Sequence, residues 1–489
     1  MLKSSVIGAL MFSLLTVFVI VVPSRPSVLA YVAGTGAALI IIIHFIISAR
    51  TREKRAGKVA LLIPTLSLSF LFILLPVFFA AALYLWGAFS FFTWMLIISL
   101  SVVFYINFLC IPLAIYQKHR ENKQAAFVNH FPSISILIPA YNEEKVLRRA
   151  IETTLEATYP TNKEIIVIDD GSTDMTYSIA QEFTKKGIKL VHRPNGGKAV
   201  AINHGLRFAL GEIIVIVDAD SLVGKNSLIE LVQPLRDPDI AAVAGNIKVL
   251  NRMNWLTRCQ ALEYIASINV YRRALDVFGS VTVVPGALGA YRREVLEGGG
   301  SYDPDTLVED FDVTMKTLKT GKVVQASTAA IAYTEAPQTL GELIKQRLRW
   351  YRGNFQALWK HRDAALNARY GFLQRLAFPF LVVSMVFTPF AGLITIIAAL
   401  MAIISGTGLL LIPTFLYFCL LQLLLSLLAI ELDNEDTKLT LYTPFFIFGY
   451  KQLCDFTMIK GLLDVLLHRG LKWTNVRRIG AKVSKSALS

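Results

Sequence analysis

Long apolar stretches occupy both ends of this 489-residue chain and leave a middle of ordinary globular composition between them. The four N-terminal stretches, 6–22, 28–48, 62–86 and 92–116, are each close to the roughly 20 residues that a helix needs to cross a bilayer. Hydrophobic residues make up 54% of the chain, more than a soluble protein requires. We therefore expect about four transmembrane helices within residues 1–120.

Basic residues between the apolar stretches predict the orientation in the membrane. The linkers 49–59 and 117–123 are rich in Lys and Arg, whereas 23–27 carries one Arg and 87–91 carries no charge. Cytoplasmic linkers of membrane proteins carry the excess of Lys and Arg. The N-terminus and the middle of the chain are therefore expected in the cytoplasm, in an integral protein of the plasma membrane. A signal peptide is the alternative for the first stretch, but another apolar stretch follows it directly.

The C-terminal third is less regular. Segments 376–404 and 408–430 have the length of membrane helices, whereas 443–467 carries four charged residues, which are costly inside a bilayer. We expect interfacial and transmembrane helices with two to three crossings within 357–470, and a basic tail at 471–489. Because the tail is cytoplasmic only if the crossings are even in number, one segment is expected not to cross fully.

Residues 130–356 read as one cytoplasmic α/β domain. Short apolar runs alternate with amphipathic segments there, which is typical of βαβ units and predicts a Rossmann-like, mostly parallel sheet. Three of the runs end in polar residues, and they read SISILIPAYNEE, EIIVIDDGSTD and GEIIVIVDADS. Because the carboxyl ends of parallel strands meet at the sheet edge where such folds bind ligands, these acids are expected to lie together.

The first two strand ends suit a nucleotide. Asp169 and Asp170 supply carboxylates that accept hydrogen bonds from a base N–H or a ribose hydroxyl, and Tyr141 supplies a ring that contacts a base. A plain turn that caps the next helix is the alternative for the two acids. Further on, Lys198 follows two glycines in NGGK, which favours a phosphate site, with a solvated loop as the alternative.

The third strand leads directly into Asp218 and Asp220, which a single alanine separates. Two carboxylates this close repel each other unless a cation lies between them. Mg²⁺ is usually held by one or two carboxylates together with substrate phosphates, and Mn²⁺ accepts the same ligands. The sequence therefore predicts a Mg²⁺ or Mn²⁺ site that neutralises a departing nucleoside diphosphate. Acids that cap the next turn are the alternative.

Two later segments add candidate catalytic groups. Glu309 and Asp310 precede an amphipathic helix, where a carboxylate can take a proton from an attacking hydroxyl. Acids that simply favour the first turn of a helix are the alternative. In QRLRWYRGNFQ, Arg349 suits a diphosphate and Trp350 suits stacking beneath a sugar ring. The alternative there is a basic juxtamembrane helix, with Arg347 and Arg352 on lipid headgroups.

The ordered set PAYNEE, DDGSTD, NGGKAVAINHG, DADS, VPGALGAYRRE, VEDFD and QRLRW resembles the membrane-embedded, processive family-2 glycosyltransferases, which include synthases of hyaluronan, cellulose and poly-N-acetylglucosamine. The resemblance covers roughly 132–356 by motif and the flanking helices by architecture. It implies a GT-A fold between transmembrane helices, a UDP-sugar donor, a divalent cation and inversion at the anomeric carbon. Four N-terminal spans are more than the two expected of a hyaluronan or poly-N-acetylglucosamine synthase.

Carried over to this chain, the resemblance implies a role for each matching residue. Asp310 corresponds to the catalytic base, with Glu309 beside it at the substrate, and Asp218 and Asp220 form the DxD pair at ribose and metal. Lys198 lies near the donor. The resemblance places Tyr141, Glu143, Asp169 and Asp170 at the uridine, and Gln346, Arg349 and Trp350 at the donor diphosphate and the acceptor sugar.

The function implied is hexosyl transfer from a UDP-sugar of the UDP-N-acetylglucosamine or UDP-glucose type to a growing polysaccharide, with translocation of the polymer across the membrane. Transfer of a single sugar to polyprenyl phosphate or another lipid is the main alternative. A membrane scaffold with an inactive nucleotide-binding domain has no reason to keep all these acids. Nucleic-acid binding driven by the net charge of +14 is disfavoured, because much of that charge lies in juxtamembrane segments.

Overall fold

The computed structural model describes residues 110–121, 131–406 and 411–469, with the isolated positions 95, 99, 102, 408 and 480. The first three predicted N-terminal helices, most of the fourth and most of the basic tail lie outside these residues. The chain divides into two compact units, and each is described by itself. One consists of Met1–Arg120 and Val382–Phe456, and the other of Glu121–Leu381 and Thr457–Ser489.

The second unit contains an eight-stranded sheet with the strand order β3-β2-β1-β4-β7-β6-β8-β5. Its strands are β1 (Ile134–Ala140), β2 (Lys163–Asp169), β3 (Lys189–His192), β4 (Ile213–Ile216), β5 (Leu222–Val223), β6 (Ile240–Val249), β7 (Gly289–Arg292) and β8 (Val323–Thr334).

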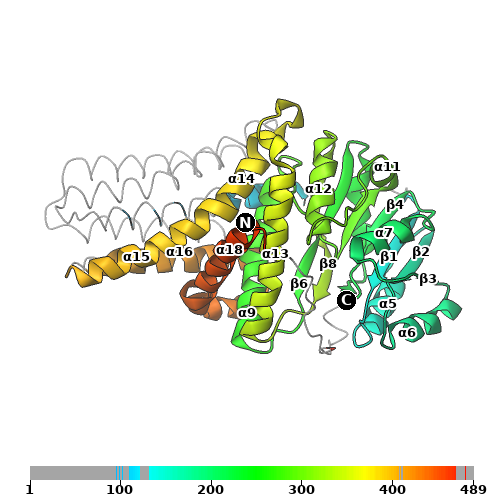
Figure 1. Cartoon of the computed structure of the whole chain (residues 1–489), viewed down its shortest axis with the longest axis horizontal. Coiled ribbons are helices and arrows are strands. Elements are labelled where there is room, and N and C mark those ends of the chain that lie inside the picture. The colour runs from blue at the N-terminus through cyan, green and yellow to red at the C-terminus, as the bar shows by residue number, and fades with distance from the viewer. Residues whose placement is uncertain are drawn as a thin grey trace, which may run out of the picture. The chain divides into compact units, whose positions relative to one another are not determined.

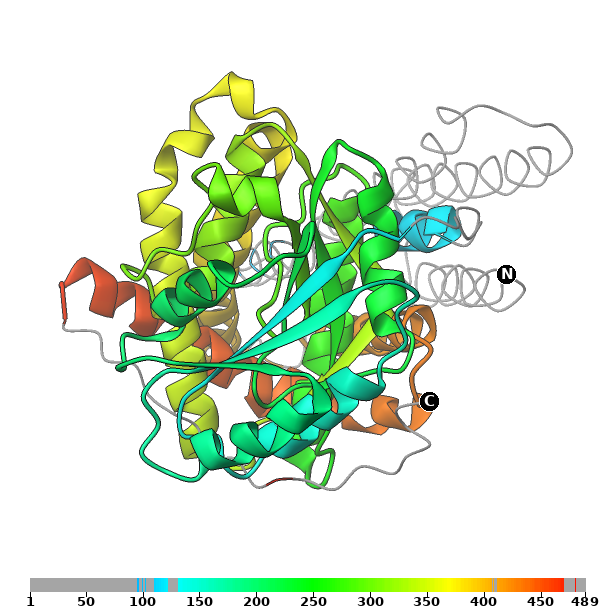
Figure 2. The ribbon, with the colours of Figure 1, turned by 90° about the vertical axis from the view of Figure 1, so that its right-hand side faces the viewer.

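The first four strands in this order are parallel, as the sequence predicts. β1 and β2 run side by side in Figure 2, with Ala140 opposite Asp169 at their carboxyl ends. All residues of β1 and β4 are buried, because helices cover both faces of parallel strands and leave no polar face. The carboxyl ends of β1, β2 and β4 therefore carry the predicted acids to one edge.

The other half of the sheet adds antiparallel pairs to the expected, mostly parallel arrangement. β7 runs antiparallel to both β4 and β6, and β5 runs antiparallel to β8, whereas β6 and β8 are parallel. The sheet is therefore mixed. A buried strand has the same apolar pattern in either direction, so the runs of apolar residues alone do not predict which way a strand points.

Helices surround this sheet (Figure 1). α7 packs against β1 and β2, and α12 packs against β6, β8 and the long helix α13. The helices of this part are α5 (Leu147–Glu156), α6 (Thr176–Glu182), α7 (Lys198–Leu206), α8 (Ser227–Val232), α9 (Trp255–Glu263), α10 (Val270–Asp276), α11 (Arg293–Glu297), α12 (Glu309–Lys319) and α13 (Leu340–Lys360), with a π-helical segment, Tyr264–Asn269, between α9 and α10.

Side-chain caps begin two of these helices. Asn254 accepts a hydrogen bond from the Thr257 N–H at 2.9 Å and starts α9, and Thr339 accepts one from the Glu342 N–H at 3.3 Å and starts α13. Such caps satisfy N–H groups that have no partner within the helix. α13 is the helix that the QRLRW segment predicts.

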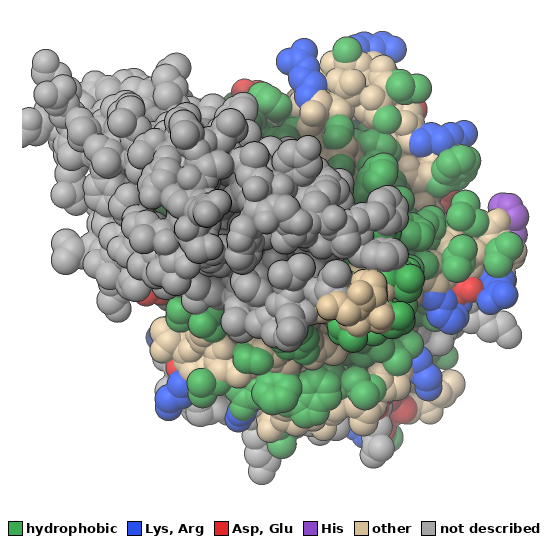
Figure 3. Space-filling view, turned by 90° about the vertical axis from the view of Figure 1, so that its left-hand side faces the viewer, with side chains coloured by type: hydrophobic (Ala, Val, Ile, Leu, Met, Phe, Trp, Pro, Cys, Tyr) green, Lys and Arg blue, Asp and Glu red, His purple; other side chains and the backbone are tan. Residues whose placement is uncertain are grey.

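Among the described residues, one helix, Leu373–Ile404, is long and apolar enough to cross a membrane. It includes α14 (Phe378–Val382) and α15 (Thr388–Ile404), and it covers the predicted segment 376–404. Large apolar side chains such as Phe387, Leu400 and Ile404 are exposed along it. Exposed hydrophobic side chains also appear on the described part of the face in Figure 3.

The remaining helices are α16 (Leu411–Leu432), α17 (Thr443–Phe445) and α18 (Lys451–Leu466). The predicted segment 443–467 is not one continuous helix, because Phe448 and Gly449 leave helical geometry, the latter at φ +104°. α18 alone has 16 residues, fewer than the roughly 20 that span a bilayer. The charged side chains of α18 form the ion pairs Lys451–Asp455 and Lys460–Asp464. The number of membrane crossings in this part of the chain stays a prediction.

Candidate active site

Two loops, at the carboxyl ends of β1 and β2, are joined by hydrogen bonds. The Asn142 N–H donates to the Ser172 hydroxyl at 3.0 Å, and the Asn142 side chain accepts from the Thr173 N–H at 2.8 Å. The Glu143 N–H donates to the Thr176 hydroxyl at 2.8 Å. The backbone that carries Tyr141 and Glu143 is therefore fixed against the DDGSTD loop, as the convergence of strand ends predicts.

Asp169 and Asp170 are both buried at the end of β2, and neither caps α6. Asp169 accepts a hydrogen bond from His192 Nδ1 at 2.7 Å, across the β2–β3 pair. Asp170 forms an ion pair with Arg193 and accepts hydrogen bonds from the N–H groups of the NGG loop, at 3.2 Å from Gly196 and 2.8 Å from Gly197.

The anion that these glycine N–H groups approach in the structure is therefore a carboxylate of the chain itself. Asp170 holds the loop that begins α7, where Lys198 is the first helical residue. The sequence associates Asp170 with the uridine and the glycines with a phosphate, and the structure links the two segments directly.

Lys198 connects two predicted sites. Its ammonium nitrogen lies 2.6 Å from Asp218 Oδ1 and 2.9 Å from Glu309 Oε1. Burial by itself would lower the pKa of Lys198, but the negative charges of Asp218, Glu309 and Asp310 raise it above its usual range, so the side chain is a cation at neutral pH. The strand end of β4, the start of α7 and the start of α12 therefore meet at one ammonium group.

A glycine permits this close approach. A Cβ atom at Gly286 would lie 2.5 Å from the Lys198 ammonium nitrogen and 3.1 Å from Asp218 Oδ1. Any larger residue would displace the ion pair. The VPGALG segment, which is part of the resemblance but carried no predicted role, thus forms a wall of the site.

Asp310 stands in the first turn of α12, where the helix dipole favours an anion and the Phe311 N–H donates to Asp310 Oδ1 at 2.8 Å. Burial, together with the charge of Glu309, raises the pKa of Asp310 to about 6, although Lys198 and the Phe311 N–H lower it. A carboxylate with this pKa is ionised at neutral pH and more basic than an ordinary aspartate, which suits a general base.

The acids around Lys198 fit a divalent cation. Asp218 is 30% exposed, Asp220 is buried, and Glu309 and Asp310 add further negative charge beside the Lys198 ammonium. Carboxylate oxygens are the ligands that Mg²⁺ and Mn²⁺ prefer. Of these acids, Asp218 and Asp220 sit together at the end of β4, so they are the pair that would hold the ion.

α13 carries Gln346, Arg349 and Trp350, together with Arg347 and Arg352, the two arginines of the lipid-binding alternative. Arg352 forms an ion pair with Asp464. Arg347 is 1% exposed, forms an ion pair with Glu263 at 2.5 Å, and lies over the Trp350 ring at 4.3 Å from its centroid. That alternative is wrong for Arg347, because a buried guanidinium cannot reach a headgroup.

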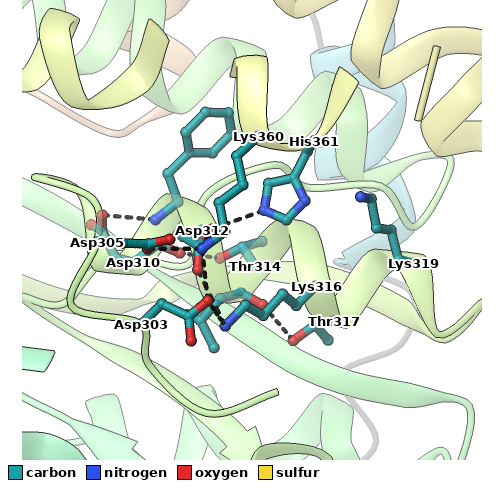
Figure 4. A network of polar contacts seen from close by, with 12 residues as sticks. Asp303, Asp305, Asp310, Asp312, Thr314, Lys316, Thr317, Lys319, Lys360 and His361 are labelled. Atoms are coloured by element: carbon teal, nitrogen blue, oxygen red, sulfur yellow. Dashed lines mark hydrogen bonds and ion pairs between the residues drawn. The ribbon is translucent and has the colours of Figure 1, made fainter. Parts of the chain in front are cut away.

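A cluster that the sequence analysis missed lies between α12 and the end of α13 (Figure 4). Asp303, Asp305 and Asp312 have carboxylate oxygens within 4.8 Å of one another. Lys360 contacts all three, at 2.6, 2.8 and 3.0 Å respectively. Lys316 also lies 2.6 Å from Asp303 and 3.3 Å from Asp312, so two ammonium groups offset much of the negative charge of these acids. No sequence pattern indicates this cluster, because Lys360 is distant from the acids along the chain.

Comparison with known proteins shows what the chain is similar to. Residues 135–300 match the family model Glycosyl transferase family 2. A poly-beta-1,6-N-acetyl-D-glucosamine synthase of Staphylococcus epidermidis is 31% identical over 228 residues, which is 46% of this chain and 55% of that protein. The enzyme of the same description from Staphylococcus aureus (strain COL) is 29% identical over 234 residues, 47% of this chain and 57% of that protein. The chain thus spans about half the length of these curated relatives.

Among solved structures, the mannosyltransferase PcManGT from Pyrobaculum calidifontis, in complex with GDP-Man and Mn²⁺, covers 76% of this chain and 100% of its own, with a TM-score of 0.52 and 20% identity. This likeness supports the fold alone. The mixed sheet therefore has a GT-A-like fold. The predicted resemblance is confirmed: residues 135–300 match the family-2 glycosyltransferase model, and the chain is similar to poly-beta-1,6-N-acetyl-D-glucosamine synthases.

Proposed function

We propose that this protein is a metal-dependent, inverting hexosyltransferase that moves a sugar from a UDP-sugar, of the UDP-N-acetylglucosamine or UDP-glucose type, to a growing polysaccharide. The observation that carries the proposal is the meeting of Asp218, Glu309 and Asp310 at Lys198. A diphosphate donor needs cations, and an attacking hydroxyl needs a base. Both occur here within one cluster of side chains.

In the proposed reaction, Asp310 takes the proton from an acceptor hydroxyl as its oxygen attacks the anomeric carbon. The new glycosidic bond forms on the face opposite the breaking bond, whose electron pair leaves with UDP, so the configuration inverts. Lys198 and Arg349 stabilise the charge on the leaving diphosphate. A Mg²⁺ or Mn²⁺ ion on Asp218 and Asp220 would supply further Lewis-acid neutralisation.

The remaining predicted residues hold the substrates in this proposal. The donor's uridine lies against the tied loops after β1 and β2, within reach of Tyr141, Glu143, Asp169 and Asp170. Asp170 also keeps the NGG loop closed, which supports a preformed donor site. On α13, Gln346 lies near the diphosphate and Trp350 stacks on the acceptor sugar.

We further propose an integral protein of the plasma membrane, because the donor is made in the cytoplasm and the polymer is delivered outside. The apolar helix Leu373–Ile404 supports this arrangement. The proposed regions are transmembrane helices at 1–120, the catalytic domain at 130–356, interfacial and transmembrane helices at 357–470, and a basic tail at 471–489. The partners are the UDP-sugar, a glycan or lipid-linked acceptor and membrane lipids.

The proposal is tested by incubating the purified protein in nanodiscs with Mg²⁺ or Mn²⁺ and a panel of nucleotide sugars, and by measuring released UDP and product size. UDP release with a long, glycosidase-sensitive product supports polysaccharide synthesis. A lipid-sized product indicates single transfer to a carrier such as polyprenyl phosphate. No release from any nucleotide sugar refutes the proposal.

The role of Asp310 is tested with the variant Asp310→Asn, which keeps the size of the side chain and removes its basicity. We expect transfer to fall by roughly a hundredfold or more, because general bases contribute about 10²–10⁴ to the rate. UDP and metal binding should be unchanged. Near-normal turnover in this variant would remove Asp310 as the base.

A further inference from the structure

Helices α12 and α13 approach each other unusually closely beside the candidate base. A Cβ atom at Gly353 of α13 would lie 2.7 Å from Cγ1 and 2.9 Å from Cγ2 of Val308, and 3.1 Å from Cβ of Leu307. Val308 is the residue from which α12 starts, immediately before Glu309 and Asp310. The absence of a side chain at Gly353 therefore sets how near α13 lies to the turn that carries Asp310.

A second attachment joins the same helices about two turns further along α13. Asp312 is fully buried and accepts hydrogen bonds from His361 Nε2 at 2.9 Å and from Lys360 at 3.0 Å, at the end of α13. Lys316 of α12 lies 3.3 Å from its other oxygen. Figure 4 shows Lys316, Lys360 and His361 turned toward Asp312.

This second attachment is strongly charged. Burial would raise the pKa of Asp312, but the hydrogen bonds from His361 and Lys360 lower it to about 2. The carboxylate is therefore an anion at neutral pH. Removing the charge of Asp312 would take one carboxylate partner away from the ammonium groups of Lys316 and Lys360. Because these groups are largely buried, the loss would destabilise the folded protein.

We propose that Gly353 and Asp312 are positioning residues, which fix α12 and α13 in a single register and thereby set the distance between the base Asp310 and Trp350. Two attachments along one helix oppose both sliding and tilting, whereas one would permit rotation about it. This inference rests on the proposed function, because it assigns Trp350 to the acceptor and Asp310 to its hydroxyl. Neither positioning residue touches a substrate.

The expected effect follows from the contact distances. Ordinary contact of a Cβ atom begins at 3.4 Å, so Gly353→Ala must move Val308 away by about 0.7 Å or distort it. A misplacement of about 1 Å in a catalytic site costs roughly a hundredfold in rate. We therefore expect kcat for sugar transfer to fall about tenfold to a hundredfold, with the donor KM and the rate of donor hydrolysis by water nearly unchanged.

The test compares the full-length variants Gly353→Ala, Val308→Ala and the double variant in nanodiscs, with UDP-N-acetylglucosamine and UDP-glucose as donors and calorimetric binding of UDP. Gly341→Ala is the matched control, because Gly341 lies on the same helix and a Cβ atom there meets nothing within 4 Å. We expect Gly341→Ala to behave as the parent, and Val308→Ala to restore most of the transfer to Gly353→Ala by removing the two atoms nearest to its Cβ.

Parental transfer by Gly353→Ala, a loss that Val308→Ala does not relieve, or a parallel loss of UDP binding would each overturn the inference. If Gly353→Ala does not fold, Asp312→Asn decides, because it keeps the volume of the side chain. Parental kcat in that variant overturns the inference, and a lower kcat with unchanged UDP binding supports it. A parent that releases UDP from no nucleotide sugar defeats the proposed function, and the positioning role falls with it.

Discussion

The substitution Glu309→Gln isolates the electrostatic contribution to the candidate base. Glu309 immediately precedes Asp310 in the chain. Burial is the largest cause that raises the pKa of Asp310 to about 6, and the negative charge of Glu309 is the second largest. The glutamine side chain introduced by the substitution has nearly the same shape as glutamate but carries no charge. The substitution removes a repulsion that opposes ionisation of Asp310, so the pKa of Asp310 must fall.

The magnitude follows from the total rise. The pKa of Asp310 rises from the usual value of an aspartate, near 3.9, to about 6, which is roughly two pKa units or about 3 kcal/mol. Burial is the larger cause of this rise and the charge of Glu309 the next, so removing that charge should lower the pKa of Asp310 by part of the rise. The acidic limb of the rate profile should then move from about pH 6 to lower pH.

The assay is the pH dependence of kcat/KM for UDP release in the presence of acceptor, since this parameter reports the ionisation of the free enzyme. Activity in the parent should fall as the pH decreases through about 6, because Asp310 becomes protonated and cannot accept a proton. In Glu309→Gln the fall should begin at lower pH. An unmoved acidic limb, or one that moves to higher pH, would refute the electrostatic reasoning.

Two further predictions concern α13 and the cluster at its end. Trp350→Ala should lower polymer yield severalfold, because an aromatic contact contributes roughly 0.5–1.5 kcal/mol. Donor hydrolysis should fall less than polymer yield, and equal losses of both would contradict stacking of Trp350 on the acceptor sugar. Asp312, with its depressed pKa, should contribute about 2 kcal/mol of stability at neutral pH, present above about pH 4 and lost as pH falls toward about 2. Thermal unfolding of Asp312→Asn beside the parent checks this: the gap between them should narrow in acid, and a constant gap would contradict it.

Local sequence patterns predict much of the catalytic half of the sheet. The runs that form β1, β2 and β4 have the unbroken apolar character of strands covered on both faces, and each is followed by the acids that the structure brings to one edge. The helical segments that begin at Glu309 and around Trp350 are predictable too, because period and capping are properties of neighbouring residues.

Partnerships across the chain are not predictable in this way. Nothing in NGGK indicates that Lys198 pairs with Glu309, or that Asp170 holds Gly196 and Gly197. Sequence spacing carries no information on contacts between distant segments. Arg347 shows the same limit, because its burial against Glu263 depends on how α9 and α13 pack.

The sequence by itself thus determined the family resemblance, the parallel core strands and the set of candidate acids, since these follow from residue types and their local order. The tertiary structure alone decided which of those acids face one another, which arginines are buried, and the direction of β7 between β4 and β6. It also revealed the meeting of Asp312 with the end of α13. Each of these depends on contacts between segments far apart in the chain, where packing and electrostatics act on the folded molecule as a whole.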